Sequence, residues 1–229
     1  MIKIIYLLLM AFLINVSASA KGIKSLVLFY DEIEQGVGVQ NMRYIINENY
    51  LRIDDGKDNA DFILFDVKQK IIFSINHEDQ TILKIENNSW QRPQLSFEVD
   101  IKQQLMPGAP KVFNQAVYSY VVNANDMACT QVSFVKDKYL KDMQVLYLYQ
   151  QVLSGQQVAT LKNTPKDMHT PCFLIDQVYH AGEYYKLGLP IHISYSRGYE
   201  KFLKSFKEME LDKSLFIKPE KYEEYKAAF

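Results

Sequence analysis

Residues 50–85 read YLRIDDGKDNADFILFDVKQKIIFSINHEDQTILKI, and this stretch decides the fold. Short apolar, β-branched and aromatic runs recur here about every ten residues, and polar turn residues separate them. Each run is long enough for one strand and each break suits a tight turn, so the pattern predicts an antiparallel meander. The four predicted strands are Tyr50–Ile53, Phe62–Phe65, Ile71–Ile75 and Ile82–Ile85.

The same strand chemistry continues on both sides of this meander. We expect two strands before it, at Ser25–Tyr30 and Met42–Ile46, and three after it, at Leu95–Ile101, Ala116–Val122 and Thr130–Val135. The segment Leu95–Ile101 alternates apolar and polar residues, which is typical of a strand with one buried face. The first part of the chain therefore predicts one large antiparallel sheet.

The pattern changes after Leu140, where turn signals become rare. An apolar face within Val145–Lys162 predicts a helix, and Cys172–Ala181 predicts a second, shorter helix that stops at Gly182. Apolar residues recur with helical spacing over residues 199–210, although a strand remains open there. These segments supply the helices that a one-sided sheet needs as a cover.

No internal repeat and no long polar linker divides the chain. We therefore expect a single α+β domain over residues 21–229, with a curved antiparallel sheet covered by helices on one face. The tail Leu215–Tyr225 carries aromatic residues among its charges, and we expect it to pack through them.

The first twenty residues predict a secretory signal peptide. Lys3 precedes the apolar run Ile4–Ile14, and Ala18-Ser19-Ala20 provides the small residues of a cleavage site before Lys21. The apolar run is shorter than the roughly 20 residues that a spanning helix needs, so cleavage is favoured over an uncleaved membrane anchor. No cysteine lies near the cleavage site, so we expect no lipid anchor, and we expect a periplasmic location.

Export decides how the two cysteines, Cys129 and Cys172, are interpreted. In an oxidising compartment they form the only possible intramolecular disulfide. Such a bridge would close a loop of about 44 residues and stabilise the fold by about 4 kcal/mol in the chain-entropy model. A redox or nucleophilic cysteine is the alternative, but the sequence has no Cys-x-x-Cys motif.

Composition excludes several classes of protein. The 229 residues are 48% hydrophobic and 23% charged, and their formal net charge is −1. A chain this apolar and this balanced in charge is not intrinsically disordered. It also lacks the basic excess of a dedicated nucleic-acid binder, so we expect no nucleic-acid partner.

The order of these segments resembles periplasmic proteins of unknown function that share the fold of the lipoprotein carriers LolA and LolB. The motifs that carry the resemblance are Tyr50–Asp55, Asp61–Asp66, Lys70–His77, Gly188–Ile191 and Leu215–Pro219 with the following Tyr222. The resemblance implies an incomplete β-barrel closed by helices around an apolar cavity, and an apolar ligand or a lipidated partner. We transfer only the fold of that family to this chain, and we assign no functional residue from the resemblance.

Metal chemistry has little support in the sequence. The four histidines form neither a His-x-x-x-His nor a His-Glu-x-x-His motif. His169 and Cys172 have the spacing of two metal ligands, but a structural zinc site needs about four. The acidic turn Asp54–Asp61 lacks the glycine placement of a calcium-binding EF-hand loop, and a solvated hairpin turn is favoured. We therefore expect no metal and no cofactor.

Catalytic motifs are also missing. The chain has no Gly-x-Ser-x-Gly elbow, and Gly36-Val37-Gly38 lacks the further residues of a phosphate-binding loop. We assign no catalytic residue and expect no covalent chemistry, although an enzyme with an unrecognised site remains an alternative.

Two functions follow from these expectations. The first is a periplasmic, non-enzymatic protein that binds a lipid, an acyl chain or another apolar ligand in a cavity under the sheet. The second is an envelope interaction or structural protein with a filled core and no small-molecule ligand. The expected partners are a lipid or lipidated protein, or an envelope protein, with peripheral membrane contact. Six tyrosines are candidates for lining a cavity: Tyr118, Tyr120, Tyr147, Tyr149, Tyr184 and Tyr185.

Overall fold

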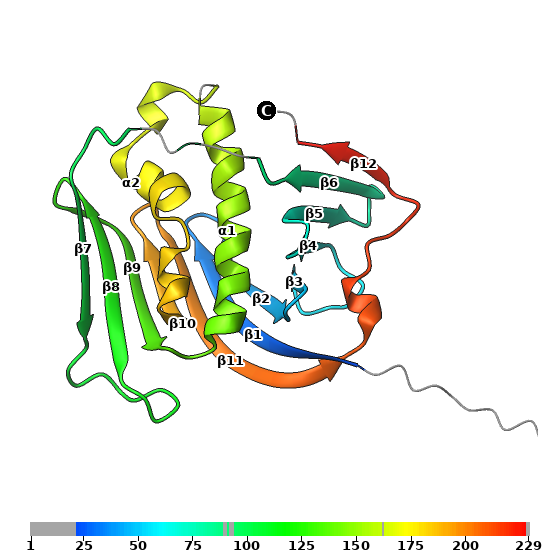
Figure 1. Cartoon of the computed structure of the whole chain (residues 1–229), viewed down its shortest axis with the longest axis horizontal. Helices are drawn as coiled ribbons and strands as arrows, with labels where there is room; N and C mark the ends of the chain where they lie inside the picture. The colour runs from blue at the N-terminus through cyan, green and yellow to red at the C-terminus, as the bar shows by residue number, and fades with distance from the viewer. Residues whose placement is uncertain (1–21, 89–90, 92–93, 162, 228–229) are drawn as a thin grey trace, which may run out of the picture.

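The structure is a computed structural model that describes residues 22–88, 91, 94–161 and 163–227. The predicted signal peptide and its cleavage site lie outside the described residues. Within them, twelve strands form one open and mostly antiparallel sheet, and α-helices cover one face of it (Figure 1). The predicted α+β class is confirmed.

The strands follow one another with few crossovers. Their order across the sheet is β12-β6-β5-β4-β3-β2-β1-β11-β10-β9-β8-β7, and β12 pairs with β6 in parallel while the other pairs are antiparallel. The strands are β1 (Ile23–Glu34), β2 (Gly38–Ile46), β3 (Tyr50–Asp54), β4 (Phe62–Asp66), β5 (Ile71–Asn76), β6 (Thr81–Glu86), β7 (Val99–Leu105), β8 (Val117–Ala124), β9 (Met127–Lys136), β10 (Gly188–Tyr195), β11 (Tyr199–Leu211) and β12 (Glu223–Lys226).

The long helix α1 (Leu140–Leu161) lies against the inner face of the curled sheet (Figure 1). A second helix, α2 (Pro171–Leu174), continues directly into the π-helical turn η2 (Ile175–Tyr179), and the 3-10 turn η3 (Glu183–Lys186) follows. Both predicted helical segments are therefore confirmed, the second as a composite of short turns. None of the helices in the described part of the chain combines the length and apolarity needed to cross a membrane.

Two hydrophobic cores lie on opposite faces of the sheet because successive side chains of a strand point to opposite sides. On β1, Leu26 and Leu28 face α1 and join the larger core, whereas Val27 joins the smaller one. The smaller core is covered by the C-terminal segment, where Phe216 is buried and stacks on Tyr50 at 5.7 Å between ring centroids. The predicted packing of the tail through its aromatic residues is confirmed.

The disulfide between Cys129 and Cys172 is confirmed. It joins β9 to the start of α2, and the two Cα atoms are 4.8 Å apart. Both cysteines are buried, so the bridge holds the short helical segment against the inner face of the sheet. A disulfide is typical of exported proteins, whose compartments are oxidising.

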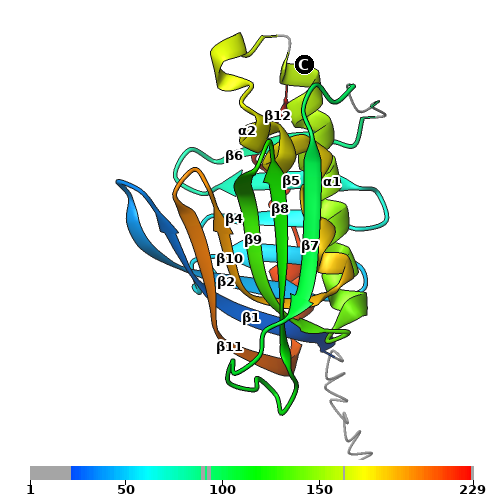
Figure 2. The ribbon, with the colours of Figure 1, turned by 90° about the vertical axis from the view of Figure 1, so that its left-hand side faces the viewer.

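The predicted one-sided strand Leu95–Ile101 is wrong in its extent and its burial. Strand β7 begins only at Val99 and forms one edge of the sheet (Figure 2). Its residue Ile101 is 45% exposed. Phe97 packs on Tyr179 before the strand begins. Apolar and polar residues do alternate in this segment, but β7 lies at the edge of the sheet and no layer in the described part of the chain covers its exposed apolar residues.

Residues 199–210 form strand β11, although their apolar residues recur with helical spacing. The cause is a β-bulge at Lys204: Tyr30 pairs with Leu203, while Phe29 pairs with Ser205. The extra residue resets the alternation, so Leu203 and Phe206 both pack against the larger core although they are three apart. A single inserted residue thus gives a strand the spacing of a helix.

Candidate ligand-binding site

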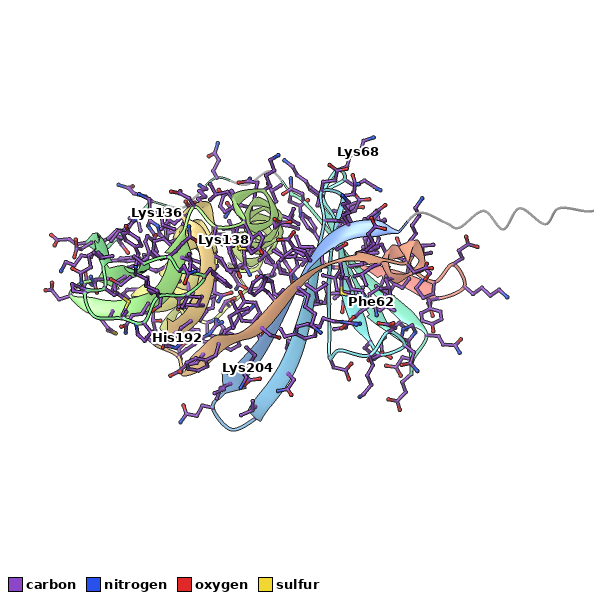
Figure 3. The ribbon with its side chains drawn as sticks, turned by 90° about the horizontal axis from the view of Figure 1, so that it is seen from below. Phe62, Lys68, Lys136, Lys138, His192 and Lys204 are labelled. Carbon is purple, nitrogen blue, oxygen red and sulfur yellow. A yellow bond between two sulfur atoms is a disulfide. The ribbon has the colours of Figure 1, made fainter. Side chains whose placement is uncertain are left out.

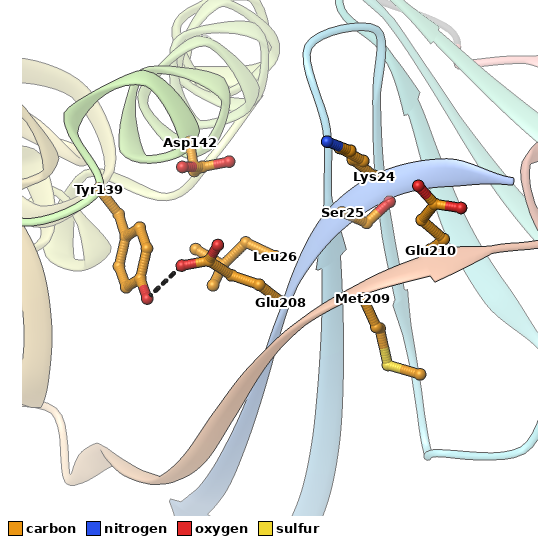
Figure 4. Close-up of a pocket in the computed structure, with 8 residues that line it drawn as sticks. All are labelled: Lys24, Ser25, Leu26, Tyr139, Asp142, Glu208, Met209 and Glu210. Atoms are coloured by element: carbon orange, nitrogen blue, oxygen red, sulfur yellow. Dashed lines mark hydrogen bonds between the residues drawn. The ribbon is translucent and has the colours of Figure 1, made fainter.

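Two pockets lie near opposite ends of β1 on the inner face of the sheet. The first, which we call the mouth pocket, has a volume of about 520 Å³ and lies beside Lys24–Leu26 at the start of the strand (Figure 4). The second lies beside the far end of β1 and has a volume of about 170 Å³. We call it the tyrosine pocket, and its walls are Tyr44, Gln150, Leu153, Asp176, Gln177, Tyr184, Tyr185, Ile193, Tyr195, Arg197, Tyr199 and Lys201.

Strand register brings the polar side chains of the tyrosine pocket together. Lys201 on β11 pairs with Glu32 on β1 and with Ile193 on β10, while Tyr199 pairs with Tyr195. Paired residues point to the same face of a sheet, so these side chains all face the helices. Side chains from α1, η2 and η3 close the pocket from the opposite side.

Lys201 is the most unusual residue of this site because it is a lysine with only 4% of its surface exposed. Its Nζ lies 3.3 Å from Oε1 of Glu32. The same ammonium lies 3.6 Å from the ring centroid of Tyr44 and 4.3 Å from that of Tyr30. One carboxylate and two aromatic faces therefore replace the water that this charge has lost.

The pKa values of this pair reflect burial and mutual attraction. Burial lowers the pKa of Lys201 to about 8, and Glu32 opposes that shift. Burial acts to raise the pKa of Glu32, but the charge of Lys201 and hydrogen bonds from Tyr44 and Tyr199 hold it below its usual value. The hydroxyl of Tyr44 donates to Oε1 of Glu32 at 2.5 Å. The pair is therefore an ion pair near neutral pH, set in an aromatic cage.

Further tyrosines form the wall of the pocket. The hydroxyls of Tyr184 and Tyr195 are 2.9 Å apart and share a hydrogen bond, and the rings of Tyr184 and Tyr185 lie 4.5 Å apart between centroids. Burial raises the pKa of Tyr184 and Tyr185 well above the usual value, and it raises the pKa of Tyr195 to about 12. These hydroxyls therefore keep their protons and act as neutral hydrogen-bonding groups.

Asp176 and Arg197 complete the site. The buried carboxyl of Asp176 accepts a hydrogen bond from the hydroxyl of Thr130. Burial raises the pKa of Asp176 to about 7, while Thr130 and the charge of Arg197 act to lower it. Arg197 occupies the β10–β11 turn, with its guanidinium carbon 5.0 Å from the ring centroid of Tyr195 and 5.6 Å from that of Tyr199.

The mouth pocket is larger and has a different chemistry. The hydroxyl of Tyr139 donates to Oε1 of Glu208 at 2.8 Å, and Asp142 at the start of α1 faces the same space (Figure 4). Burial and the nearby charge of Glu208 raise the pKa of Asp142. The floor of the mouth pocket near Leu26 is apolar, and acidic side chains line its rim. Among the described lining residues, none is a fully buried charged side chain that could bind a ligand.

Two of the histidines, His77 and His192, make structural contacts. His77 Nδ1 lies 2.8 Å from the hydroxyl of Tyr222, which fastens the C-terminal segment. His192 stacks on Phe202 at 4.2 Å between ring centroids. Figure 3 shows His192 and Lys204 on the outer face, away from α1. Cys172 is oxidised, so His169 and Cys172 do not form a metal-ligand pair.

The acidic turn after β3 is a structural network. Asp54 accepts hydrogen bonds from Arg43 at 2.8 Å and from the buried Arg52 at 2.6 Å. Arg52 also donates to the carbonyl oxygen of Leu215 and lies over the ring of Phe62. The network anchors the C-terminal segment to the sheet. The sequence favoured a solvated hairpin turn here, whereas the side chain of Asp54 is buried within this network.

Of the six tyrosines proposed from the sequence, Tyr184 and Tyr185 line the tyrosine pocket. The other four pack elsewhere, for example Tyr149 against Phe65 in the larger core. Sequence reasoning missed Glu32, Arg197 and Lys201. Lys201 lies at a position of β11 whose side chain faces the helices. Its burial could be inferred from the sequence only if residues 199–211 were already known to form a strand.

Comparisons with known proteins give little further information. No family model matches the chain, and no curated protein matches it. Among solved structures, PNGF-II in its C2 and P21 crystal forms covers 90% of this chain at 11% and 13% identity, with TM-scores of 0.43 and 0.44. This chain spans about a third of the length of PNGF-II, 31% and 32% in the two forms. A likeness this distant supports no conclusion about function.

Proposed function

We propose that this chain is an exported periplasmic binding protein that holds a small molecule in the tyrosine pocket without covalent chemistry. The proposal includes a carrier-like half-barrel of the LolA and LolB kind, in which α1 lies inside the open sheet. The observation that carries it is the buried Lys201–Glu32 pair, whose lysine lines a partly open, hydrogen-bonding cavity. Such a pair contributes little net stability, so its position beside a pocket favours a role in recognition.

The polar lining favours a ligand that makes hydrogen bonds over a bare acyl chain. Hydroxyl, amide, carboxyl and guanidinium groups converge on a space of about 170 Å³. An acyl chain placed there would leave those groups without partners, which is costly in a buried site. The predicted lipid or acyl ligand therefore remains a proposal for the mouth pocket, where Leu26 and Tyr139 offer apolar surface.

Native mass spectrometry tests the proposal on protein purified from its own host without denaturation. Gln177→Trp fills the tyrosine pocket, which Gln177 lines. Gln131→Trp places the same bulk on the exposed surface of β9 and serves as the matched control. We expect a bound small molecule on the wild type and on Gln131→Trp, and none on Gln177→Trp.

Circular dichroism of both variants confirms that they are folded before the spectra are compared. A wild type without any bound molecule would refute the proposal. A lipid carried equally by all three proteins would also refute it, and would place the ligand at another site such as the mouth pocket.

A second candidate function is an interaction with another envelope protein, and the exposed edge of β7 favours it. This strand lies at one edge of the sheet (Figure 2). Its residues Ile101 and Leu105 are 45% and 48% exposed. An open edge offers backbone hydrogen bonds to an extended segment of a partner. A photo-crosslinking side chain at position 101 should give one discrete product in the periplasm, and the same group at the exposed Leu83 should not. Identical products from both positions would contradict this candidate.

A further inference from the structure

The charged groups that line the tyrosine pocket favour one class of ligand. Two of them are cationic, Lys201 and Arg197, and one is a carboxyl, Asp176. Glu32 stands behind Lys201 and already receives hydrogen bonds from tyrosine hydroxyls, so it balances the lysine and not a ligand. This leaves Arg197, which forms no close ion pair among the described residues and interacts with the carboxyl of Asp176 only at longer range.

Arg197 is placed to meet an incoming anion. It is exposed at the β10–β11 turn, and among the described residues it has no carboxylate within ion-pair distance. Its guanidinium lies over two tyrosine rings at the edge of the cavity. A guanidinium fixed by aromatic faces presents its planar fork to a carboxylate with little loss of freedom.

The remaining walls describe the body of the ligand. The rings of Tyr184 and Tyr185 and the side chains of Leu153 and Ile193 present flat or apolar surface to the cavity. A cavity of about 170 Å³ restricts the ligand to a small molecule, and benzoate is a small, flat, aromatic monocarboxylate that can serve as a probe. The hydroxyls of Tyr184 and Tyr195 add hydrogen-bonding groups at one side.

We infer that the tyrosine pocket selects a small monocarboxylate with a flat, apolar or aromatic body, whose carboxylate is bound by Arg197. The inference rests on the proposed function, that this pocket holds a small molecule. The raised pKa of Asp176 supports it, because a protonated carboxyl donates a hydrogen bond and does not repel an anion.

Isothermal titration calorimetry at pH 6 with benzoate, benzamide and inorganic phosphate tests this inference on the full-length mature protein. Benzamide keeps the shape of benzoate without its charge, and phosphate keeps a charge without the flat body. We expect benzoate to bind at least about tenfold more tightly than either of the other probes, because a hydrogen bond to a charged group is the stronger kind.

The variant Arg197→Gln should weaken benzoate binding at least about tenfold. Lys136→Gln is the matched control, since Lys136 is exposed and its ammonium also lies over a tyrosine ring, at 5.9 Å from the centroid of Tyr118. Benzoate affinity should stay unchanged in this control. Equal loss in both variants would overturn the role of Arg197.

The possible results distinguish the proposed function, that the pocket holds a small molecule, from the inference that this molecule is a monocarboxylate. Equal binding of benzamide and benzoate would overturn the anion class and leave a small-molecule pocket intact. Tighter binding of phosphate would overturn the carboxylate class. Failure of all three probes would overturn the inference, while native mass spectrometry of the Gln177→Trp variant still decides separately whether the pocket holds any ligand.

Discussion

At the scale of single residues, the ion pair of Lys201 and Glu32 is the feature that most distinguishes this chain from an ordinary sheet protein. Each partner has lost most of its contact with water, and each compensates the other at 3.3 Å. Removing one partner leaves a buried charge without compensation, whereas removing both leaves none. The energetic consequence of a substitution therefore depends on what happens at the other position.

We predict that Lys201→Met lowers the free energy of unfolding by about 3–5 kcal/mol, and that the double variant Glu32→Gln with Lys201→Met recovers most of this loss. Urea denaturation of the wild type, both single variants and the double variant measures the coupling. Additive losses in the double variant would contradict the account of this pair.

A second residue-scale prediction concerns Asp176, which faces Thr130, Tyr195 and Arg197. The folded-state pKa is about 7, above the value of an unfolded aspartate. Between about pH 4 and pH 7 the folded state holds a proton that the unfolded state has released, so the free energy of unfolding falls as the pH rises. Asp176→Asn removes this cost.

Asp176→Asn should therefore be more stable than the wild type above pH 7, by on the order of 4 kcal/mol, and equally stable below about pH 4. Thermal and urea denaturation at pH 4, 6 and 8 measure the difference. A constant difference across this range would show that Asp176 is ionised throughout.

Neither Lys201 nor Asp176 could be recognised from the sequence as a buried charged residue. The residues around Lys201 alternate in the same way as those around a solvated lysine in an amphipathic strand. Its partner, Glu32, lies on β1 near the other end of the chain. Tyr184 and Tyr185 could be proposed as cavity residues only as members of a large set of aromatic residues in predicted strands and helices. Their partners Tyr195 and Arg197 depend on a hairpin that the sequence analysis did not predict.

At the scale of elements, local patterns predicted most strands because each run carries its own turn signals. The meander over residues 50–85 forms strands β3 to β6 as expected. Strand β11 was ambiguous because the bulge at Lys204 shifts its alternation, and β12 escaped prediction because its residues Glu223–Lys226 are exposed and polar at the sheet edge. Information about pairing partners, and not local propensity, decides such segments.

The disulfide gives the prediction at this scale. Replacing both Cys129 and Cys172 with serine should lower the free energy of unfolding by about 2–4 kcal/mol, because the unfolded chain gains the freedom of a long loop. Urea denaturation of this double variant, with and without reductant, provides the measurement.

Reduction should destabilise the wild type by a similar amount and leave the double variant unchanged. A wild type that is insensitive to complete reduction would show that packing alone holds α2 against β9. The two buried sulfur atoms would then contribute only as apolar surface.

At the scale of the whole molecule, the open sheet creates an inner and an outer face with separate cores. The C-terminal segment covers part of the outer face, and α1 with the following turns covers the inner face (Figures 1 and 3). The tyrosine pocket lies where those turns leave one end of the inner face incompletely filled. Sequence composition and order predicted the class of fold, but the position of this gap depends on three-dimensional packing.

The most direct test of the central claim is a crystal structure of the protein isolated from its own host without denaturation. We predict electron density for a small molecule in the tyrosine pocket, in contact with Arg197 and the hydroxyls of Tyr184 and Tyr195. A tyrosine pocket filled only by water, with a ligand in the mouth pocket or in neither, would contradict the account.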